Sequence, residues 1–207
     1  MWRRAQIDTM GLELFHQEYP TFPDEAFLST GVCYFNAMKV NEQIEILATR
    51  QSTKIKGYFD YSYQWDNQGR RVIVTSKGFV KDSEGNVTIF EKPMPGYPYV
   101  IGADTNDNGS DYYTISVRRH DVNCRKKVAK FRIQKMDADQ FAFICYCMGM
   151  YYNKALVAIE ANRGSRANRV LACAGYPKIF VRQTMKRYDD MPANAYGFFT
   201  EGSNKEC

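Results

Sequence analysis

The sequence predicts an α/β protein with a mixed β-sheet, and three observations support this fold class. From residue 97 onward, three apolar runs are separated by short polar turns, which is typical of an antiparallel meander. A helix, a strand, a second helix and a fifth strand follow, so the predicted order is β-β-β-α-β-α-β. The 207 residues are 44% hydrophobic and 25% charged, a composition that suits a buried core and excludes a disordered chain, a collagen-like fibre or a coiled coil.

Residues 1–35 are expected to form an irregular junction segment. Pro23, followed by Asp24 and Glu25, is typical of a short helix start, because acidic residues stabilise the first helical turn. The segment has too few apolar positions to form a core of its own. We therefore expect it to dock onto the rest of the chain or onto a further domain.

The next part of the chain, residues 36–96, is expected to form one helix and a small antiparallel β insertion. Val40, Ile44 and Leu47 have the spacing of one face of an amphipathic helix. Strand-like runs separated by turn residues follow at 58–65, 72–74 and 87–90. A proline-rich connector then leads into the third part, residues 97–207.

Each element of the third part has its own signal. Phe141, Ile144 and Met148 lie at helical spacing and predict a helix over 137–152, and a second helix is expected over 162–174. Apolar runs predict the five strands, at 99–104, 112–117, 128–133, 155–160 and 178–181.

Two of these strands end in a carboxylate, Asp104 and Glu160. The meander and the crossover helix can place the first and fourth strands side by side, so that both acids lie at one edge of the sheet, where open α/β sheets bind ligands. Two facing carboxylates repel each other unless a cation lies between them, and hard oxygen ligands favour Mg²⁺ or Mn²⁺. A pair of such ions can hydrolyse phosphodiesters. The alternative is structural: Asp104 can cap the turn that follows it, and Glu160 the next helix.

Charge and cysteine content set further expectations. The net charge of +5 is compatible with a polyanionic partner without requiring one. Arg163 and Arg166 lie on one face of the helix after Glu160 and can bind phosphates, although a solvated helix face is the alternative. The six cysteines have no disulfide or zinc spacing, no signal peptide is visible, and the longest apolar stretch is too short for a bilayer. We therefore expect a soluble cytoplasmic protein with no membrane partner.

Three segments resemble tailed-phage terminase large subunits. Residues 15–20 and 24–31 are similar to the junction between the ATPase and nuclease domains of that family. Residues 99–104, with Gly109 and Asp111, resemble its first nuclease motif, and residues 152–162 resemble the second. The resemblance covers nearly the whole chain and is weakest over 36–96.

The resemblance implies an RNase H-like nuclease that cuts concatemeric viral DNA during packaging, with two divalent metal ions, Mg²⁺ or Mn²⁺. Asp104 and Glu160 correspond to the first and second metal-binding acids. Asp111 corresponds to an acid beside the site, either an outer ligand or a cap of the second strand. Asn162 is expected at a helix N-terminus, where backbone N–H groups can face a phosphate. The implied partners are double-stranded DNA, the ATPase domain of the full-length protein, the portal and the small terminase subunit, in the host cytoplasm.

The chain departs from this family in ways that leave two other functions open. It has no Walker A pattern, and it ends at Cys207, before the helix that supplies the third metal-binding aspartate in the family; Asp189 and Asp190 are the nearest acidic pair. One alternative is a non-catalytic remnant that docks a motor or portal partner. The other is a different RNase H-like enzyme, such as a recombinase or resolvase, which the junction motif argues against.

Overall fold

A computed structural model describes residues 2–19, 36–49, 53–105, 111–121, 126–162, 165–185 and 192–199. The chain divides into two compact units, Met1–Ser52 and Thr53–Cys207. None of the helices in the described part of the chain combines the length and the apolarity that a bilayer span requires.

The first unit is more helical than the sequence predicts. Two short helices, α1 (Trp2–Met10) and α2 (Leu12–Glu18), occupy a stretch expected to be irregular. The Trp2 ring lies 6.1 Å from the Phe15 ring and 5.2 Å from the Tyr19 ring, between centroids. These aromatic contacts stabilise two helices that are each too short for a clear periodic pattern. The helix start expected at Pro23 lies outside the described residues.

The third described helix of this unit, α4 (Ala37–Thr49), coincides with the amphipathic helix that the sequence predicts. Asn36 precedes it, and the Asn36 side-chain oxygen accepts a hydrogen bond from the Lys39 backbone N–H at 3.0 Å. Asparagine is a favoured N-cap, so the start of α4 is determined locally.

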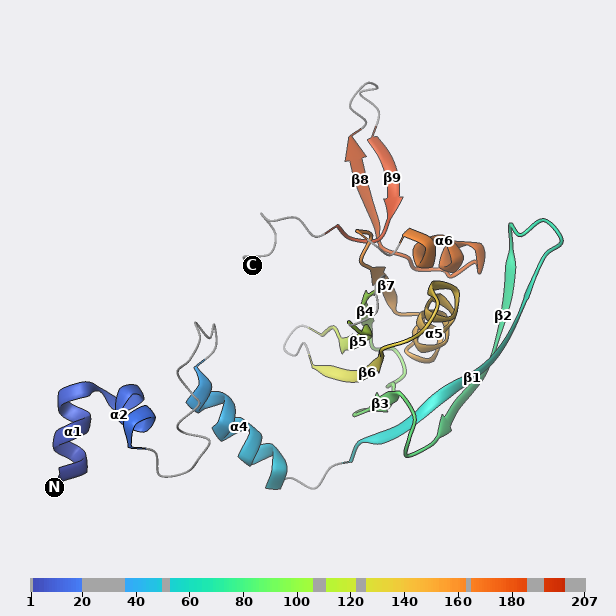
Figure 1. Cartoon of the computed structure of the whole chain (residues 1–207). Helices are drawn as coiled ribbons and strands as arrows, with labels where there is room; N and C mark the ends of the chain where they lie inside the picture. Colours follow the sequence, from blue (N-terminus) through green and yellow to red (C-terminus); the bar gives the residue numbers. More distant parts are fainter. Residues whose placement is uncertain are drawn as a thin grey trace. The chain divides into compact units, whose positions relative to one another are not determined.

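The second unit is built on one seven-stranded mixed sheet, with two helices and a hairpin beside it (Figure 1). The spatial order of the strands is β2-β1-β3-β6-β5-β4-β7. The strands are β1 (Ile55–Trp65), β2 (Val72–Lys81), β3 (Val87–Ile89), β4 (Tyr99–Asp104), β5 (Tyr113–Arg119), β6 (Lys127–Ile133) and β7 (Leu156–Ile159), the helices are α5 (Ala138–Tyr151) and α6 (Ser165–Cys173), and the hairpin is β8 (Val181–Met185) with β9 (Pro192–Tyr196).

The small antiparallel insertion does not form a sheet of its own. The strand β3 pairs with β1 on one side and with β6 on the other, so β1, β2 and β3 extend the main sheet (Figure 1). All three residues of β3 are buried. Its partner Phe131 lies far along the chain from Val87, and local periodicity carries no information about a pairing of that range.

The core of the sheet has the predicted RNase H-like arrangement. The strand β4 pairs antiparallel with β5 and parallel with β7, so the first and fourth strands of the predicted order are neighbours. The crossover between β6 and β7 is α5. Its N-cap, Asp137, accepts hydrogen bonds from the backbone N–H groups of Asp139 and Gln140, at 2.9 and 2.8 Å. Most of α5 is buried, including the free thiols of Cys145 and Cys147.

The predicted fifth strand, 178–181, is only a single bridge in the structure. Ile179 pairs with Val157, and the chain then turns into the β8–β9 hairpin. The next position along β7 is occupied by Phe198, whose backbone N–H bonds to the Ile159 carbonyl at 3.2 Å. Because the segment after β9 takes this edge of the sheet, the strand after α6 cannot continue along β7.

Candidate active site

Asp104 and Glu160 meet at the edge of the sheet where the parallel strands β4 and β7 end. Asp104 is the last residue of β4, and Glu160 directly follows β7. The Glu160 backbone N–H donates to the Ala103 carbonyl at 2.9 Å, which aligns the two strand ends. The two carboxyl side chains share a hydrogen bond. The juxtaposition that the strand order predicts is therefore present.

This proximity changes the acidity of the pair. Partial burial, the hydrogen bond to Glu160 and the charge of Glu160 raise the pKa of Asp104 to about 6, and the charge of Asp111 contributes further. The hydrogen bond from the Thr105 backbone acts in the opposite direction. A cation between the two carboxyl groups would remove the repulsion that disfavours their charged forms.

The acid pair opens into a polar cleft of about 580 Å³. It is lined by residues of β4, β5 and β6 and by residues that directly follow β4 and β7 or precede β5, namely Asp104, Thr105, Asp111, Tyr112, Thr114, Arg132 and Glu160. Asp111, the third candidate ligand, thus lies in the same cleft as the pair. The described residues contain no group of three His, Cys, Asp or Glu side chains close enough to hold one metal ion.

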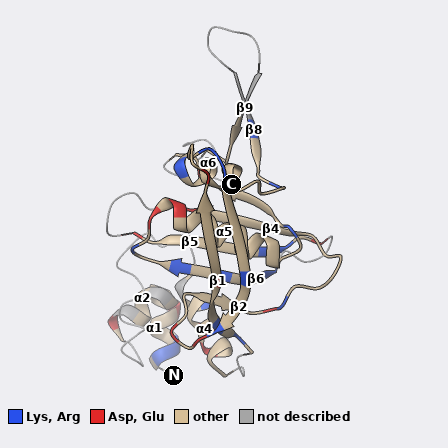
Figure 2. Cartoon of the chain, turned by 90° about the vertical axis from the view of Figure 1, so that its right-hand side faces the viewer, with Lys and Arg blue, Asp and Glu red and all other residues tan. Residues whose placement is uncertain are grey.

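Arg132 is a cleft residue that the sequence analysis missed. Asp104 pairs with Thr114 across β4 and β5, and Thr114 pairs with Arg132 across β5 and β6. Aligned residues on neighbouring strands share a face of the sheet. The strand register would have identified Arg132, but it is not readable from one strand alone. Figure 2 shows basic residues along β6, and the Arg132 guanidinium carbon lies 3.6 Å from the Tyr112 ring centroid.

The cleft has the oxygen ligands that a hard divalent cation needs. Asp104 and Glu160 supply carboxylate oxygens, and the Thr105 hydroxyl, which also borders the cleft, is buried with no hydrogen-bond partner among the described residues. Mg²⁺ is commonly held by one or two carboxylates, with water and substrate phosphate completing its shell. The residues present therefore fit Mg²⁺ or Mn²⁺.

The structure describes two of the three candidate phosphate-binding residues, Asn162 and Arg166. The helix α6 begins at Ser165, so Asn162 lies in the turn before the helix rather than in its first turn. Arg163 lies outside the described residues, as do Asp189 and Asp190. The Arg166 guanidinium donates two hydrogen bonds to the Asp139 carboxylate, at 2.6 and 2.7 Å, and this pairing raises the pKa of Arg166. Arg166 thus ties the start of α6 to the start of α5.

The raised pKa of Asp104 predicts a specific dependence of stability on pH. Between its ordinary value of 3.8 and about 6, the folded state holds a proton on Asp104 more tightly than the unfolded chain does. Folding stability from this group is therefore fully present at low pH and decreases as the pH rises through this range. We expect the melting temperature of the wild type to fall more between these pH values than that of Asp104→Asn. Equal slopes in metal-free buffer, measured by differential scanning calorimetry, would contradict the raised pKa of Asp104.

Comparison with known proteins gives structural matches only. No protein-family model matches the chain, and no characterised sequence matches it. Among solved structures, the chain is similar to the large terminase nuclease from thermophilic phage G20c, with 22% identity and a TM-score of 0.40 over 45% of this chain and 49% of that one. Its magnesium-bound form matches with 21% identity and a TM-score of 0.41, over 47% and 50%.

The large terminase nuclease domain of Thermus phage P74-26 matches with 15% identity and a TM-score of 0.34, over 56% of this chain and 77% of that one. The match to the G20c nuclease spans about half of its length.

Proposed function

We propose that this chain is the nuclease part of a phage terminase large subunit and that it hydrolyses DNA phosphodiester bonds at the Asp104–Glu160 pair. The observation that carries this proposal is the meeting of the two carboxyl groups at the end of β4 and β7, with a shared hydrogen bond. The biological role that follows is cleavage of concatemeric viral DNA during packaging. Double-stranded DNA, the ATPase domain, the portal and the small terminase subunit are the proposed partners.

The proposed mechanism uses Asp104 and Glu160 to hold the divalent cations, with Asp111 supporting them from the same cleft. Divalent cations held by these residues would supply activation of water and stabilisation of the leaving oxygen in phosphodiester hydrolysis. The chain itself supplies the positions of the ligands and, through Arg132, a positive charge within the cleft. The ring of Tyr112 supports the guanidinium, which can then pair with a substrate phosphate.

The proton on the acid pair links activity to pH. Because the pKa of Asp104 is raised to about 6, the pair must release a proton before both carboxylates can act as ligands. Cation binding and cleavage should therefore increase as the pH rises through about 6.

Nicking of supercoiled plasmid by the purified chain tests the proposal. We expect nicking with Mn²⁺ that stops on addition of EDTA. We also expect Mn²⁺ at neutral pH to raise the melting temperature, since a cation that binds only the folded state stabilises it. A folded chain that neither nicks nor is stabilised in Mn²⁺ or Mg²⁺ would contradict the proposal.

One observation favours a second candidate, the non-catalytic remnant. The described residues lack a cluster of three acidic ligands, whereas the family that the motifs resemble uses three metal-binding acids. A remnant would retain the fold and bind partner proteins without nicking DNA. The same plasmid assay, with folding confirmed by circular dichroism, separates the two candidates.

A further inference from the structure

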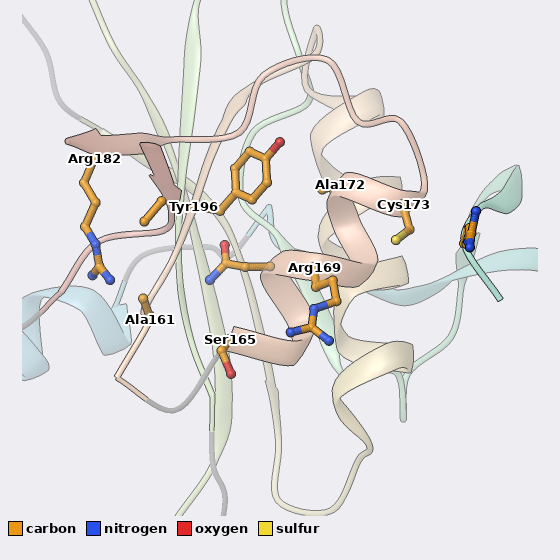
Figure 3. Close-up of a pocket in the computed structure, with 10 residues that line it drawn as sticks. Ala161, Ser165, Arg169, Ala172, Cys173, Arg182 and Tyr196 are labelled. Atoms are coloured by element: carbon orange, nitrogen blue, oxygen red, sulfur yellow. The ribbon is translucent and has the colours of Figure 1, made fainter. Parts of the chain in front are cut away.

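A second cavity, of about 570 Å³, lies between α6 and the β8–β9 hairpin (Figure 3). Three of its ten lining residues are arginines and none is acidic. Arg169 comes from α6, Arg182 from β8, and Arg70 from the turn between β1 and β2. Three cations around one cavity repel one another unless an anion occupies it.

Arg182 gives the most specific sign of an anionic ligand. Its Nε and Nη1 atoms are buried and have no hydrogen-bond partner among the described residues. Its guanidinium carbon lies 4.9 Å from the Phe199 ring centroid, a contact that supports the group but satisfies none of its N–H donors. A buried charged donor without an acceptor is costly, and an oxyanion in the cavity would remove that cost.

Arg169 differs from its neighbour on the same helix. The Arg166 guanidinium is held by Asp139, whereas Arg169 is exposed and borders the cavity. In the view of Figure 3, Ser165 and Ala161 lie between Arg169 and Arg182. The Ser165 hydroxyl adds a neutral donor to the same lining.

The cavity is next to the acid pair along the chain. Ala161, which lines it, directly follows Glu160, and the Ala161 backbone N–H donates to the Phe198 carbonyl at 2.7 Å. The hairpin side of the cavity is thus attached to the end of β7. Gly197 permits this close approach: its φ is +81°, and a Cβ there would lie 2.4 Å from the Ile159 carbonyl oxygen.

We propose that this cavity binds backbone phosphates of the nucleic-acid strand that passes the Asp104–Glu160 pair, through Arg169 and Arg182. The inference rests on the proposed nuclease function and adds a phosphate-binding site to it. Ala161 lines this cavity and directly follows Glu160. The phosphates of a strand that extends from the acid pair past Ala161 would therefore meet the cavity. Phosphate contacts of this kind hold a strand in place without reading its sequence.

Binding of a short fluorescent DNA duplex, measured by anisotropy in EDTA, tests the site without cleavage. We expect Arg169→Gln and Arg182→Gln each to weaken binding by about tenfold. Each should also lower the slope of log affinity against log salt by about 1, because one phosphate contact is lost. The matched control is Arg118→Gln, which removes the same charge from an exposed position on β5 that pairs with Val100, away from the acid edge, and should leave the slope unchanged.

Two further variants make the result interpretable. Arg169 is exposed, so Arg169→Gln does not threaten the fold, while Arg182→Lys keeps the charge near Phe199 and should recover part of the binding. The site is wrong if Arg169→Gln and Arg182→Gln bind like Arg118→Gln, if the wild type does not bind DNA, or if it binds only inorganic phosphate. Plasmid nicking then shows separately whether the acid pair cleaves DNA.

Discussion

Asp104→Asn and Glu160→Gln are each expected to lower metal-dependent DNA nicking by about 10³-fold, because each would remove one of the two proposed metal ligands at the sheet edge. The amide replacements keep the size of each side chain and remove only its charge. The measurement is the initial rate of plasmid nicking in Mn²⁺, with the wild type and both variants purified in parallel.

The stability of these variants separates a lost ligand from a lost fold. Since the carboxyl groups of Asp104 and Glu160 disfavour each other's charged form, Asp104→Asn should retain or slightly raise the melting temperature at neutral pH. Asp111→Asn should reduce nicking less, because Asp111 lines the cleft without forming a three-ligand cluster with the pair. Wild-type rates of nicking in both Asp104→Asn and Glu160→Gln would place the reaction elsewhere.

Gly149→Ala is expected to lower the free energy of unfolding by about 2 kcal/mol. A Cβ at this position of α5 would lie 2.1 Å from the Tyr176 hydroxyl oxygen and 2.6 Å from the carbon that carries it. That hydroxyl donates a buried hydrogen bond to the Ala155 carbonyl at 2.6 Å. Overpacking costs about 1–3 kcal/mol and an unmade buried hydrogen bond a similar amount, whereas the better helix propensity of alanine returns only about 1 kcal/mol.

Urea unfolding provides the measurement for this prediction, with Gly102→Ala as the matched control. A Cβ at Gly102 meets no heavy atom within 4 Å, so the same chemical change there should alter stability by less than about 1 kcal/mol. Combining Gly149→Ala with Tyr176→Phe removes the closest clashing atom and should recover part of the loss. Equal, small effects at Gly149 and Gly102 would show that Tyr176 can move aside at little cost.

Much of the candidate site was predictable because its signals are local. An apolar run that ends in Asp104 and another that ends before Glu160 each identify a strand and its last residue. The β-β-β-α-β order then indicates that β4 and β7 are parallel neighbours, which the structure confirms. The N-cap of α5 is equally local, since Asp137 binds backbone groups two and three residues away.

The residues that only the structure reveals depend on partners far along the chain. Arg132 reaches the acid cleft through the register of β5 and β6, and Arg182 enters the second cavity because the β8–β9 hairpin folds beside α6. The helical position of Arg166 makes it a candidate for phosphate binding. Its hydrogen bonds to Asp139, however, depend on how α6 packs against α5.

The sequence by itself determined the order of the elements from β4 to α6 and the two carboxylates at the strand ends, because short-range periodicity and turn chemistry act within a few residues. The tertiary structure decided that β1, β2 and β3 join the main sheet, that single bridges at Ile179 and Phe198 take the place of a fifth strand beside β7, and which arginines line a cavity. These outcomes depend on which backbone edges and charged side chains find one another over long distances. Pairings of that kind are selected by the packed molecule as a whole and leave little trace in any local pattern.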